Sequence, residues 1–254
     1  MKTVILCGGK GTRMREITED MPKPMALIGG RPILWHLMKI YQFYGCNDFV
    51  FLLGYKGDKI KEYFLDYHWK NHNFVLDSAE ETIQLLGKRE PWKITFVDTG
   101  LETMTGSRIK RARNYIGENT FMLTYGDGLS NINILNLLQY HKERGKIATV
   151  TGITPKSQYG TLIVENGIAK AFQEKPQSAE LINGGFFVFN KEIFDYLDDD
   201  TNCILEQEPM KNLAKEQQLA VYNHKGFWLA MDTYKDITLA NEIWDRREEG
   251  WKTW

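Results

Sequence analysis

A glycine-rich turn with nearby cations is the stretch of this sequence best suited to chemistry. We call residues 6–13 the glycine turn; they read Leu-Cys-Gly-Gly-Lys-Gly-Thr-Arg, and Pro-Lys-Pro follows at residues 22–24. Glycines at three of four positions allow a sharp bend that brings backbone N–H groups close to an anion, and Arg13 and Lys23 add two positive charges. An apolar run at residues 3–6 predicts a buried strand just before the turn. The pattern therefore indicates a phosphate-binding turn, with a tight turn and incidental charges as the alternative.

Several common catalytic sites do not match this sequence. The glycine turn lacks the closing Gly-Lys-Ser/Thr of a P-loop, and Met14 stands where a dinucleotide-binding fingerprint needs a glycine. The histidines show no ligand spacing, and no Gly-x-Ser-x-Gly elbow or Cys/His pairing is present. These absences argue against a P-loop kinase and a nicotinamide-dependent oxidoreductase, and they leave no nucleophile–base pair in the sequence.

Two aspartates follow predicted strands in the second part of the chain. Asp127 lies between two glycines after the apolar run 121–125, and Asp232 follows the run 227–230. In open α/β sheets, ligands bind at the carboxyl ends of the strands, so the two side chains are expected to converge there. Mg²⁺ binds through one or two carboxylates together with substrate phosphates, so the pair predicts a magnesium site. Either aspartate alone could instead be a helix N-cap.

A reaction without a general base suits this set of residues. A phosphate monoester is mostly dianionic near neutral pH, because its second pKa is about 6. Such a nucleophile needs only neutralisation of charge repulsion and in-line alignment on the α-phosphorus of a nucleoside triphosphate. Arg13, Lys23 and Mg²⁺ would supply both.

The order of predicted elements indicates an α/β fold. In the first half, apolar strand patterns alternate with helical patterns, which predicts a mostly parallel Rossmann-like sheet with helices on both faces. The strand at 147–151 is expected to complete this repeating part, and residues 73–90 to form a strand and an irregular insertion. Beyond residue 155, shorter strands separated by turn signals predict a smaller, added β-rich lobe, and a helix is expected at residues 234–249.

Composition limits the partners and the compartment. The 254 residues carry a formal net charge of -1, which gives no reason to expect nucleic-acid binding, and no apolar run approaches a membrane span. The chain starts directly with the first predicted strand, so we expect no signal peptide. Three scattered cysteines fit a reducing cytoplasm. Trp251 and Trp254 are expected to pack back on the chain or to meet another subunit.

The added lobe begins with two short polar motifs. Glu174-Lys175-Pro176 could place a lysine on the phosphate of an acceptor substrate. Asn183-Gly184-Gly185 could read hydroxyl groups, because an amide offers both a donor and an acceptor and the glycines leave room for a ring. Each motif alone is more often a turn or a hairpin.

These motifs together resemble the sugar-1-phosphate nucleotidyltransferase family. Its signature is a strand followed by G-G-x-G-T-R and P-K-P, and later a G-D, an E-K-P, an N-G-G and a late aspartate, in this order. Stretches such as Val97-Asp98-Thr99-Gly100 and the terminal Trp251-Lys252-Thr253-Trp254 most resemble the members that use CTP and glucose 1-phosphate. The resemblance implies CDP-glucose and pyrophosphate as products, Mg²⁺ as cofactor, a role in polysaccharide biosynthesis such as that of O-antigen, and a homo-oligomer such as a hexamer.

The resemblance also implies roles for particular residues. Arg13 and Lys23 would be catalytic, and Asp127 and Asp232 would hold the metal. The nucleotide would be bound by Leu6, Cys7, Gly8, Gly9, Lys10, Gly11, Thr12, Arg13, Lys23, Thr103, Arg108 and Gly126. The sugar would be bound by Tyr125, Glu174, Lys175, Asn183 and Gly184. The chain would be one domain, residues 1–254, with a nucleotide-binding part at about 1–153 and a sugar-binding lobe, including Asp232 and the last helix, at about 154–254.

Two positions depart from the family pattern. Cys7 replaces a usual alanine, which the turn should tolerate because both side chains are small. Leu229 and Ala230 are less polar than expected in the glucose-specific members, which bears on the sugar more than on the nucleotide. UTP or dTTP as donor, and another phosphorylated sugar or polyol as acceptor, therefore remain alternatives. A non-catalytic regulatory protein that binds nucleotide sugars is a third interpretation, disfavoured because Arg13, Lys23 and both aspartates are present.

Overall fold

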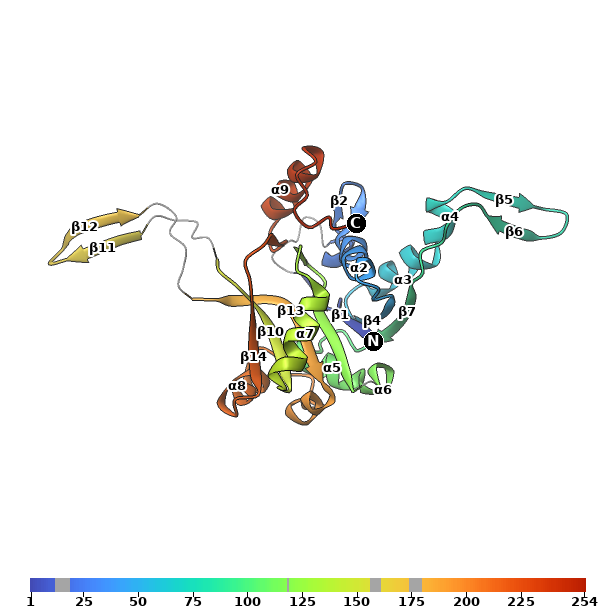
Figure 1. The fold of residues 1–254 in the computed structure, drawn as a ribbon. Coiled ribbons are helices and arrows are strands. Elements are labelled where there is room, and N and C mark those ends of the chain that lie inside the picture. The colour runs from blue at the N-terminus through green and yellow to red at the C-terminus, as the bar shows by residue number, and fades with distance from the viewer. Residues whose placement is uncertain (12–18, 118, 156–160, 174–179) are drawn as a thin grey trace.

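A seven-stranded sheet forms the centre of the computed structural model (Figure 1), which describes residues 1–11, 19–117, 119–155, 161–173 and 180–254. The strand order is β14-β10-β13-β8-β1-β4-β7. The strands are β1 (Lys2–Leu6), β4 (Asp48–Leu53), β7 (Lys93–Asp98), β8 (Thr120–Tyr125), β10 (Ala148–Ile153), β13 (Ile182–Asn190) and β14 (Leu219–His224). Neighbouring strands are parallel except β13, which is antiparallel to both β8 and β10. The predicted α/β fold with a mostly parallel sheet is confirmed.

The order of strands in the sheet does not follow the order of the chain. The predicted strand near residue 150, β10, belongs to the sheet, but the antiparallel β13, from the second part of the chain, lies between β10 and β8. β14 then pairs with β10 in parallel. Strands from both parts of the chain therefore share one sheet, and residue 153 does not separate two sheets.

Helices cover both faces of the sheet, as its alternating burial requires. In β1, Ile5 faces one buried cluster while Val4 and Leu6 face the other. The first cluster includes side chains of α2 (Ile33–Phe43), α3 (Gly57–Leu65), α7 (Ile134–Arg144) and α9 (Tyr234–Asp245). The second includes side chains of α5 (Thr105–Arg111), α6 (Arg113–Ile116), η3 (Lys191–Tyr196) and α8 (Glu208–Lys215). A short α4 (Tyr67–Asn71) follows α3.

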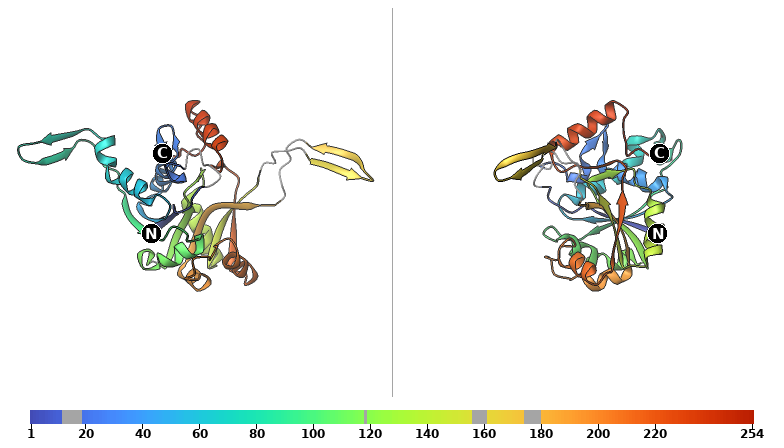
Figure 2. Two further views of the ribbon diagram at one scale, coloured as in Figure 1. Left: turned by 180° about the vertical axis from the view of Figure 1, so that it is seen from behind. Right: turned by 60° about the vertical axis from the view of Figure 1, so that its left-hand side comes forward.

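Four two-stranded ribbons surround the sheet. Two lie close to it: β2 (Leu27–Ile28) with β3 (Arg31–Pro32), and β9 (Gly128–Ser130) with β15 (Trp228–Ala230). Two project away on opposite sides (Figure 2): β5 (Phe74–Asp77) with β6 (Thr82–Leu85), and β11 (Thr161–Glu165) with β12 (Ile168–Gln173). The segment expected as a strand and an irregular insertion is thus a hairpin. Among the described residues, no helix is long and apolar enough to cross a membrane.

The C-terminal segment packs back on its own chain. Trp251 is fully buried, and its ring contacts the rings of His36, Phe227 and Trp244. Trp254 packs against Trp35 and His36 of α2. Of the two expectations for these tryptophans, the structure therefore shows packing within the chain.

Candidate active site

The glycine turn lies at the carboxyl end of β1, and its shape depends on particular glycines. A Cβ on Gly8 would lie 2.3 Å from the Arg108 guanidinium, whereas a Cβ on Gly9 would meet nothing within 4 Å. Gly11 has a φ of +60°, a conformation that glycine adopts without strain. The turn is thus closed at Gly8 and open at Gly9, where a ligand could approach the backbone. Thr12 and Arg13 lie outside the described residues.

Arg108 supports this turn from inside the protein. Arg108 is 4% exposed, and its guanidinium donates hydrogen bonds to the Gly8 carbonyl at 3.0 Å and the Leu53 carbonyl at 2.9 Å. The Gly100 and Leu101 carbonyls and the Thr99 hydroxyl are its other acceptors. Burial lowers the pKa of Arg108, but a guanidinium keeps its charge in proteins. Nucleotide contact by Arg108, which the family resemblance implies, stays a prediction; the structure shows Arg108 joining the end of β4 to the segments that follow β1 and β7.

Thr103 and Lys10 also have partners within the protein. Thr103 is buried, and its hydroxyl accepts a hydrogen bond from Arg111 at 2.7 Å. The Lys10 ammonium lies 2.5 Å from a carboxylate oxygen of Glu102. Neither residue contacts Asp127 or Asp232 in a described interaction, so any nucleotide contact by Thr103 or Lys10 remains a prediction.

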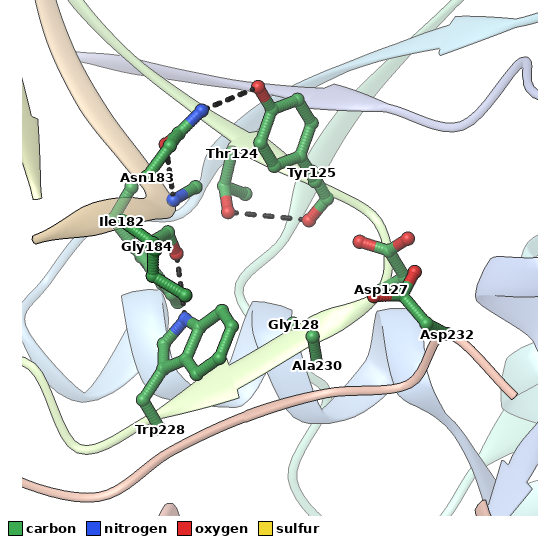
Figure 3. Close-up of a pocket in the computed structure, with 12 residues that line it drawn as sticks. Thr124, Tyr125, Asp127, Gly128, Ile182, Asn183, Gly184, Trp228, Ala230 and Asp232 are labelled. Atoms are coloured by element: carbon green, nitrogen blue, oxygen red, sulfur yellow. Dashed lines mark hydrogen bonds between the residues drawn. The ribbon is translucent and has the colours of Figure 1, made fainter. Parts of the chain in front are cut away.

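The two aspartates far apart in the sequence meet through the β9–β15 ribbon. Ala230 pairs with Gly128 in that ribbon, and the Met231 amide donates a hydrogen bond to the Asp127 carbonyl at 2.9 Å. Gly126 allows the close approach of this segment to β1, because a Cβ there would lie 2.9 Å from the Leu6 carbonyl. The two carboxylates consequently point into one space beside the end of β1 (Figure 3).

Lys23 joins the two aspartates. The lysine opens η2 (Lys23–Met25), and its ammonium lies 2.5 Å from Oδ2 of Asp127 and 3.0 Å from Oδ1 of Asp232. Burial alone would lower the pKa of Lys23, but the contacts with both carboxylates outweigh it and raise the pKa above its ordinary value. Lys23 is therefore a charged ammonium bound by two carboxylates.

This carboxylate pair also fits a divalent cation. Two carboxylates are a donor set that suits Mg²⁺, which completes its shell with water and substrate phosphates. The ammonium already bound there shows that both side chains point at a shared cation position. The described residues contain no cluster of three or more His, Cys, Asp and Glu side chains that could hold a metal without a substrate.

A cavity of about 370 Å³ opens beside the aspartates (Figure 3). Its wall includes Tyr125, Asn183 and Gly184, three of the predicted sugar-binding residues. The Asn183 amide donates to the Tyr125 hydroxyl at 3.1 Å, and its oxygen accepts from the Gly185 amide at 2.9 Å. Glu174 and Lys175, the other two predicted sugar-binding residues, lie outside the described residues.

Sequence analysis missed two residues of this cavity region. Trp228 lines the cavity and donates its indole N–H to the Gly184 carbonyl at 2.8 Å. Glu206 accepts hydrogen bonds from the hydroxyls of Tyr125 and Thr105. Burial, with Glu206 beside it, raises the pKa of Tyr125, so the phenol is neutral at physiological pH. Alternation in the strand at 227–230 could have identified Trp228, but Glu206 follows no periodic pattern.

The alternation of side chains along β15 also decides which of Leu229 and Ala230, the apolar pair before Asp232, faces the cavity. Ala230 lines the cavity, whereas Leu229 packs into the buried cluster that contains α2. In a two-residue period, neighbouring side chains point to opposite sides of a strand. Of these two residues that depart from the family pattern, only Ala230 is placed to contact a ligand in the cavity.

Comparison with known proteins agrees with this geometry. Residues 2–246 match the model of the nucleotidyl transferase family. The chain is 59% identical over 254 residues to the probable glucose-1-phosphate cytidylyltransferase of Bacillus subtilis, with both chains covered completely. It is 44% identical to the glucose-1-phosphate cytidylyltransferase of Salmonella typhi, again over the full length of both.

Solved structures share the fold. A UDP-glucose pyrophosphorylase in complex with UDP-glucose matches with a TM-score of 0.70 at 18% identity, over 97% of this chain and 98% of the other. HddC from Yersinia pseudotuberculosis matches with a TM-score of 0.68 at 25% identity, over 96% and 99% of the two chains. With a family model that spans nearly all of the sequence and two full-length relatives, this chain belongs to the nucleotidyl transferase family.

Proposed function

We propose that this nucleotidyltransferase moves a cytidylyl group from CTP to glucose 1-phosphate and releases CDP-glucose and pyrophosphate. The observation that carries the reaction class is the group formed by Lys23, Asp127 and Asp232 between the glycine turn and the cavity. The choice of CTP and glucose 1-phosphate rests on the names of the relatives that are 59% and 44% identical.

The site residues would neutralise the charge of the triphosphate and align the two substrates. The open side of the glycine turn at Gly9 and the Lys23 ammonium would bind the triphosphate, together with Arg13. Asp127 and Asp232 would hold Mg²⁺, which when bound supplies positive charge against the triphosphate. The sugar phosphate, already a dianion, would attack the α-phosphorus in line with the leaving pyrophosphate.

The cavity is proposed to receive the sugar. Its volume of about 370 Å³ suits a ring, and the Asn183 amide and Tyr125 hydroxyl offer polar contacts there. Trp228 gives it a flat apolar wall, and Glu174 and Lys175 would contact the sugar phosphate. Gly184 and Gly185 keep the wall thin, since a Cβ on Gly185 would lie 2.6 Å from the Tyr125 ring.

A substrate panel tests this assignment. Pyrophosphate release is measured with CTP, UTP, dTTP and GTP, each against glucose 1-phosphate and several other sugar or polyol phosphates. We expect CTP with glucose 1-phosphate to give the largest kcat/KM. A larger kcat/KM with UTP or dTTP, or with another acceptor, would change the assigned substrates but not the assigned reaction. Nucleotide binding without pyrophosphate release from any pair would overturn the proposal that the protein is an enzyme.

Asp127→Asn tests the metal site within this assignment. Removing one of the two carboxylate charges is expected to lower kcat by roughly 10²–10³-fold with the fold intact, as loss of one preorganised electrostatic contact does in other enzymes. Asp66→Asn is the matched control, because Asp66 also pairs with a lysine, Lys70 at 2.6 Å, but on the surface. Full activity of Asp127→Asn at saturating Mg²⁺ would exclude the metal role.

Assembly and location are proposed along with the reaction. The projecting β5–β6 and β11–β12 ribbons expose several large apolar side chains that a homo-oligomer, such as a hexamer, would cover. All three cysteines are free thiols, in keeping with a reducing cytoplasm. Sedimentation of the purified chain tests the first proposal, and fractionation of cells that produce it tests the second.

A further inference from the structure

The ammonium of Lys23 occupies the place between the two carboxylates where a divalent cation would bind. Its distances to Asp127 and Asp232 are 2.5 and 3.0 Å, and its side chain is only 14% exposed, against 30% and 50% for the two acids. The backbone at this point is fixed, because the Pro22 carbonyl accepts the Met25 amide at 2.8 Å. With the backbone held there, exchange at this site needs only a change in the side-chain conformation of Lys23.

Lysine and metal cannot use the same carboxylate oxygens at once. Both are cations, and at contact distance their repulsion is strong in a partly buried site. A free divalent ion would have to displace an ammonium that keeps no other described anionic partner. A metal ion that arrives with a triphosphate differs, because the phosphate oxygens offer the displaced ammonium new acceptors.

We propose that Lys23 makes the site selective for the metal–nucleotide complex: without nucleotide it binds Asp127 and Asp232 and excludes free divalent ions, and phosphates release it. This inference rests on the proposed metal role of the two aspartates. It adds selectivity for the metal–nucleotide complex to the phosphate-binding and catalytic roles proposed for Lys23. Metal would then enter after, or together with, the nucleotide.

Two other described cations near the glycine turn, Lys10 and Arg108, are not placed for this role. Lys10 is bound to Glu102, and its side chain is 44% exposed. Arg108 is buried behind the turn, where its described hydrogen bonds go to carbonyls and one hydroxyl. Among these three cations, only Lys23 contacts the aspartates in a described interaction.

Retention of Mn²⁺ by the full chain in equilibrium dialysis tests the proposal without any catalytic readout. Wild type is expected to retain Mn²⁺ weakly alone and strongly with CTP. Lys23→Met, which removes the competing charge and keeps the length of the chain, is expected to bind Mn²⁺ without CTP about tenfold or more tightly than wild type. Lys39→Met is the matched control, because Lys39 is also largely buried and pairs with a carboxylate, Glu90 at 3.3 Å, outside the site; it should leave nucleotide-free Mn²⁺ binding unchanged.

The outcomes separate this inference from the proposed function. If wild type and Lys23→Met bind Mn²⁺ equally without CTP, Lys23 excludes nothing and the inference is wrong, while the metal site stands. If wild type retains no Mn²⁺ even with CTP, the proposed metal role itself fails. The double variant Lys23→Met/Asp127→Asn should lose the gain in affinity, and a gain that survives places the extra metal elsewhere and overturns the inference.

A measurement on wild type covers the case in which Lys23→Met does not fold. The ammonium ¹⁵N resonance of Lys23, observed by NMR, should shift when Mg²⁺ and CTP are added together and stay in place with Mg²⁺ alone. A shift with Mg²⁺ alone of the same size as with both would contradict the proposal.

Discussion

Two short β-ribbons of this molecule have the same local form and opposite surroundings. The β2–β3 ribbon follows η2, which begins at Lys23, and packs against α9, whereas the β5–β6 ribbon projects away from the sheet (Figure 1). Ile28 in the first ribbon is fully buried, while Leu76 in the second is 61% exposed. An isolated two-stranded ribbon is marginally stable at best. The β2–β3 ribbon is stabilised by other parts of the same chain, whereas the side chains of the β5–β6 ribbon stay largely exposed in the described part of the chain.

Support for the β2–β3 ribbon comes from the last elements of the chain. Asn241 of α9 accepts from the Gly29 amide at 3.0 Å and donates to the Leu27 carbonyl at 3.0 Å. The Trp244 ring covers Gly29, where a Cβ would lie 2.2 Å from the indole. We call Asn241, Trp244 and Trp251, together with the contacts of the two tryptophans with His36, the C-terminal clasp.

The clasp joins two parts of the active site. α9 begins directly after Asp232, and its first turn is fixed by a capping box in which Thr233 and Asp236 cap each other's backbone amides. The Asp236 carboxylate also accepts the Asp232 amide at 3.1 Å. One helix therefore holds Asp232 at its start and the ribbon that follows Lys23 along its side, which ties these two residues into one rigid arrangement.

Loss of Trp251 should destabilise the protein more than any other truncation in the clasp. The side chain is fully buried, so Trp251→Ala is expected to lower the free energy of unfolding by about 3–5 kcal/mol. Chemical denaturation measures this, and Trp69→Ala is the control beside the projecting ribbon, where Trp69 is 42% exposed and contacts Phe74. Equal losses for both variants would mean that the projecting region is supported as firmly as the clasped one.

Asn241→Leu tests the clasp as a positioning device. The substitution leaves the Gly29 amide and Leu27 carbonyl without their partner and should cost about 1–3 kcal/mol of stability. It should also raise the KM for CTP more than it lowers kcat, because Lys23 loses its fixed position before the nucleotide binds. Asn241→Asp keeps an acceptor for the Gly29 amide and should restore part of the KM. If Asn241→Leu folds and its KM for CTP is unchanged, Asn241 stabilises the fold but does not position Lys23.

The clasp also predicts a pH dependence through His36. Its Nε2 donates to the Ile28 carbonyl at 2.9 Å and its Nδ1 accepts from the Trp251 indole at 3.4 Å. The second contact requires the neutral ring, because a protonated Nδ1 has no lone pair to accept the indole N–H. Burial lowers the pKa of His36 to about 4, and the ordinary value in the unfolded chain is 6.5. Between these values the unfolded state binds the extra proton, so stability is full above pH 6.5 and falls as the pH drops toward 4.

Denaturation at pH 7 and pH 5 measures that slope. The contribution of His36 is expected to approach about 1.4 kcal/mol for each pH unit within the window. His36→Gln cannot titrate and should flatten the curve by this amount, even though burial also lowers the pKa values of His141 and His224. A slope that is equal in wild type and His36→Gln contradicts the assigned protonation state.

Local patterns explain why much of the site could be predicted from the sequence. Apolar runs placed β1 and β8, and the turn residues after them placed the glycine turn and Asp127 at one edge of the sheet. The same reasoning placed Asp232 after β15, and the structure brings it within reach of Lys23. These predictions depended only on strand ends, which short stretches of sequence define well.

Non-local pairings explain what could not be predicted. The antiparallel insertion of β13 depends on contacts with β8 and β10, which no local pattern records. Arg108 was linked to the nucleotide only through the family resemblance, and its hydrogen bonds to the carbonyls of Gly8, Leu53 and Gly100, from separate parts of the chain, could not be predicted from local patterns. His36 showed no ligand spacing, and its role became visible only when Trp251, 215 residues away, lay against it.

Substitutions in the projecting β5–β6 ribbon are expected to have the smallest effect on the stability of the monomer. They should alter the oligomeric state instead. Leu76 and Ile83 pair across the ribbon and are 61% and 47% exposed. Substituting both with lysine should change the free energy of unfolding of the monomer by no more than about 0.5 kcal/mol. If a second copy of the chain covers this ribbon, two buried charges should dissociate the assembly, as sedimentation would show.

Leu135→Lys is the matched control for that experiment, because Leu135 is 52% exposed on α7, away from both projecting ribbons. An assembly that survives Leu76→Lys/Ile83→Lys as well as it survives Leu135→Lys means that β5–β6 is not part of an interface. Ile28→Lys provides the opposite comparison, since a charge on this fully buried side chain of the clasped ribbon should prevent folding. A lysine substitution would then have a different effect in each ribbon. It would unfold the protein in β2–β3, where the same chain covers the side chain, and it would dissociate the assembly in β5–β6, where only another chain could cover it.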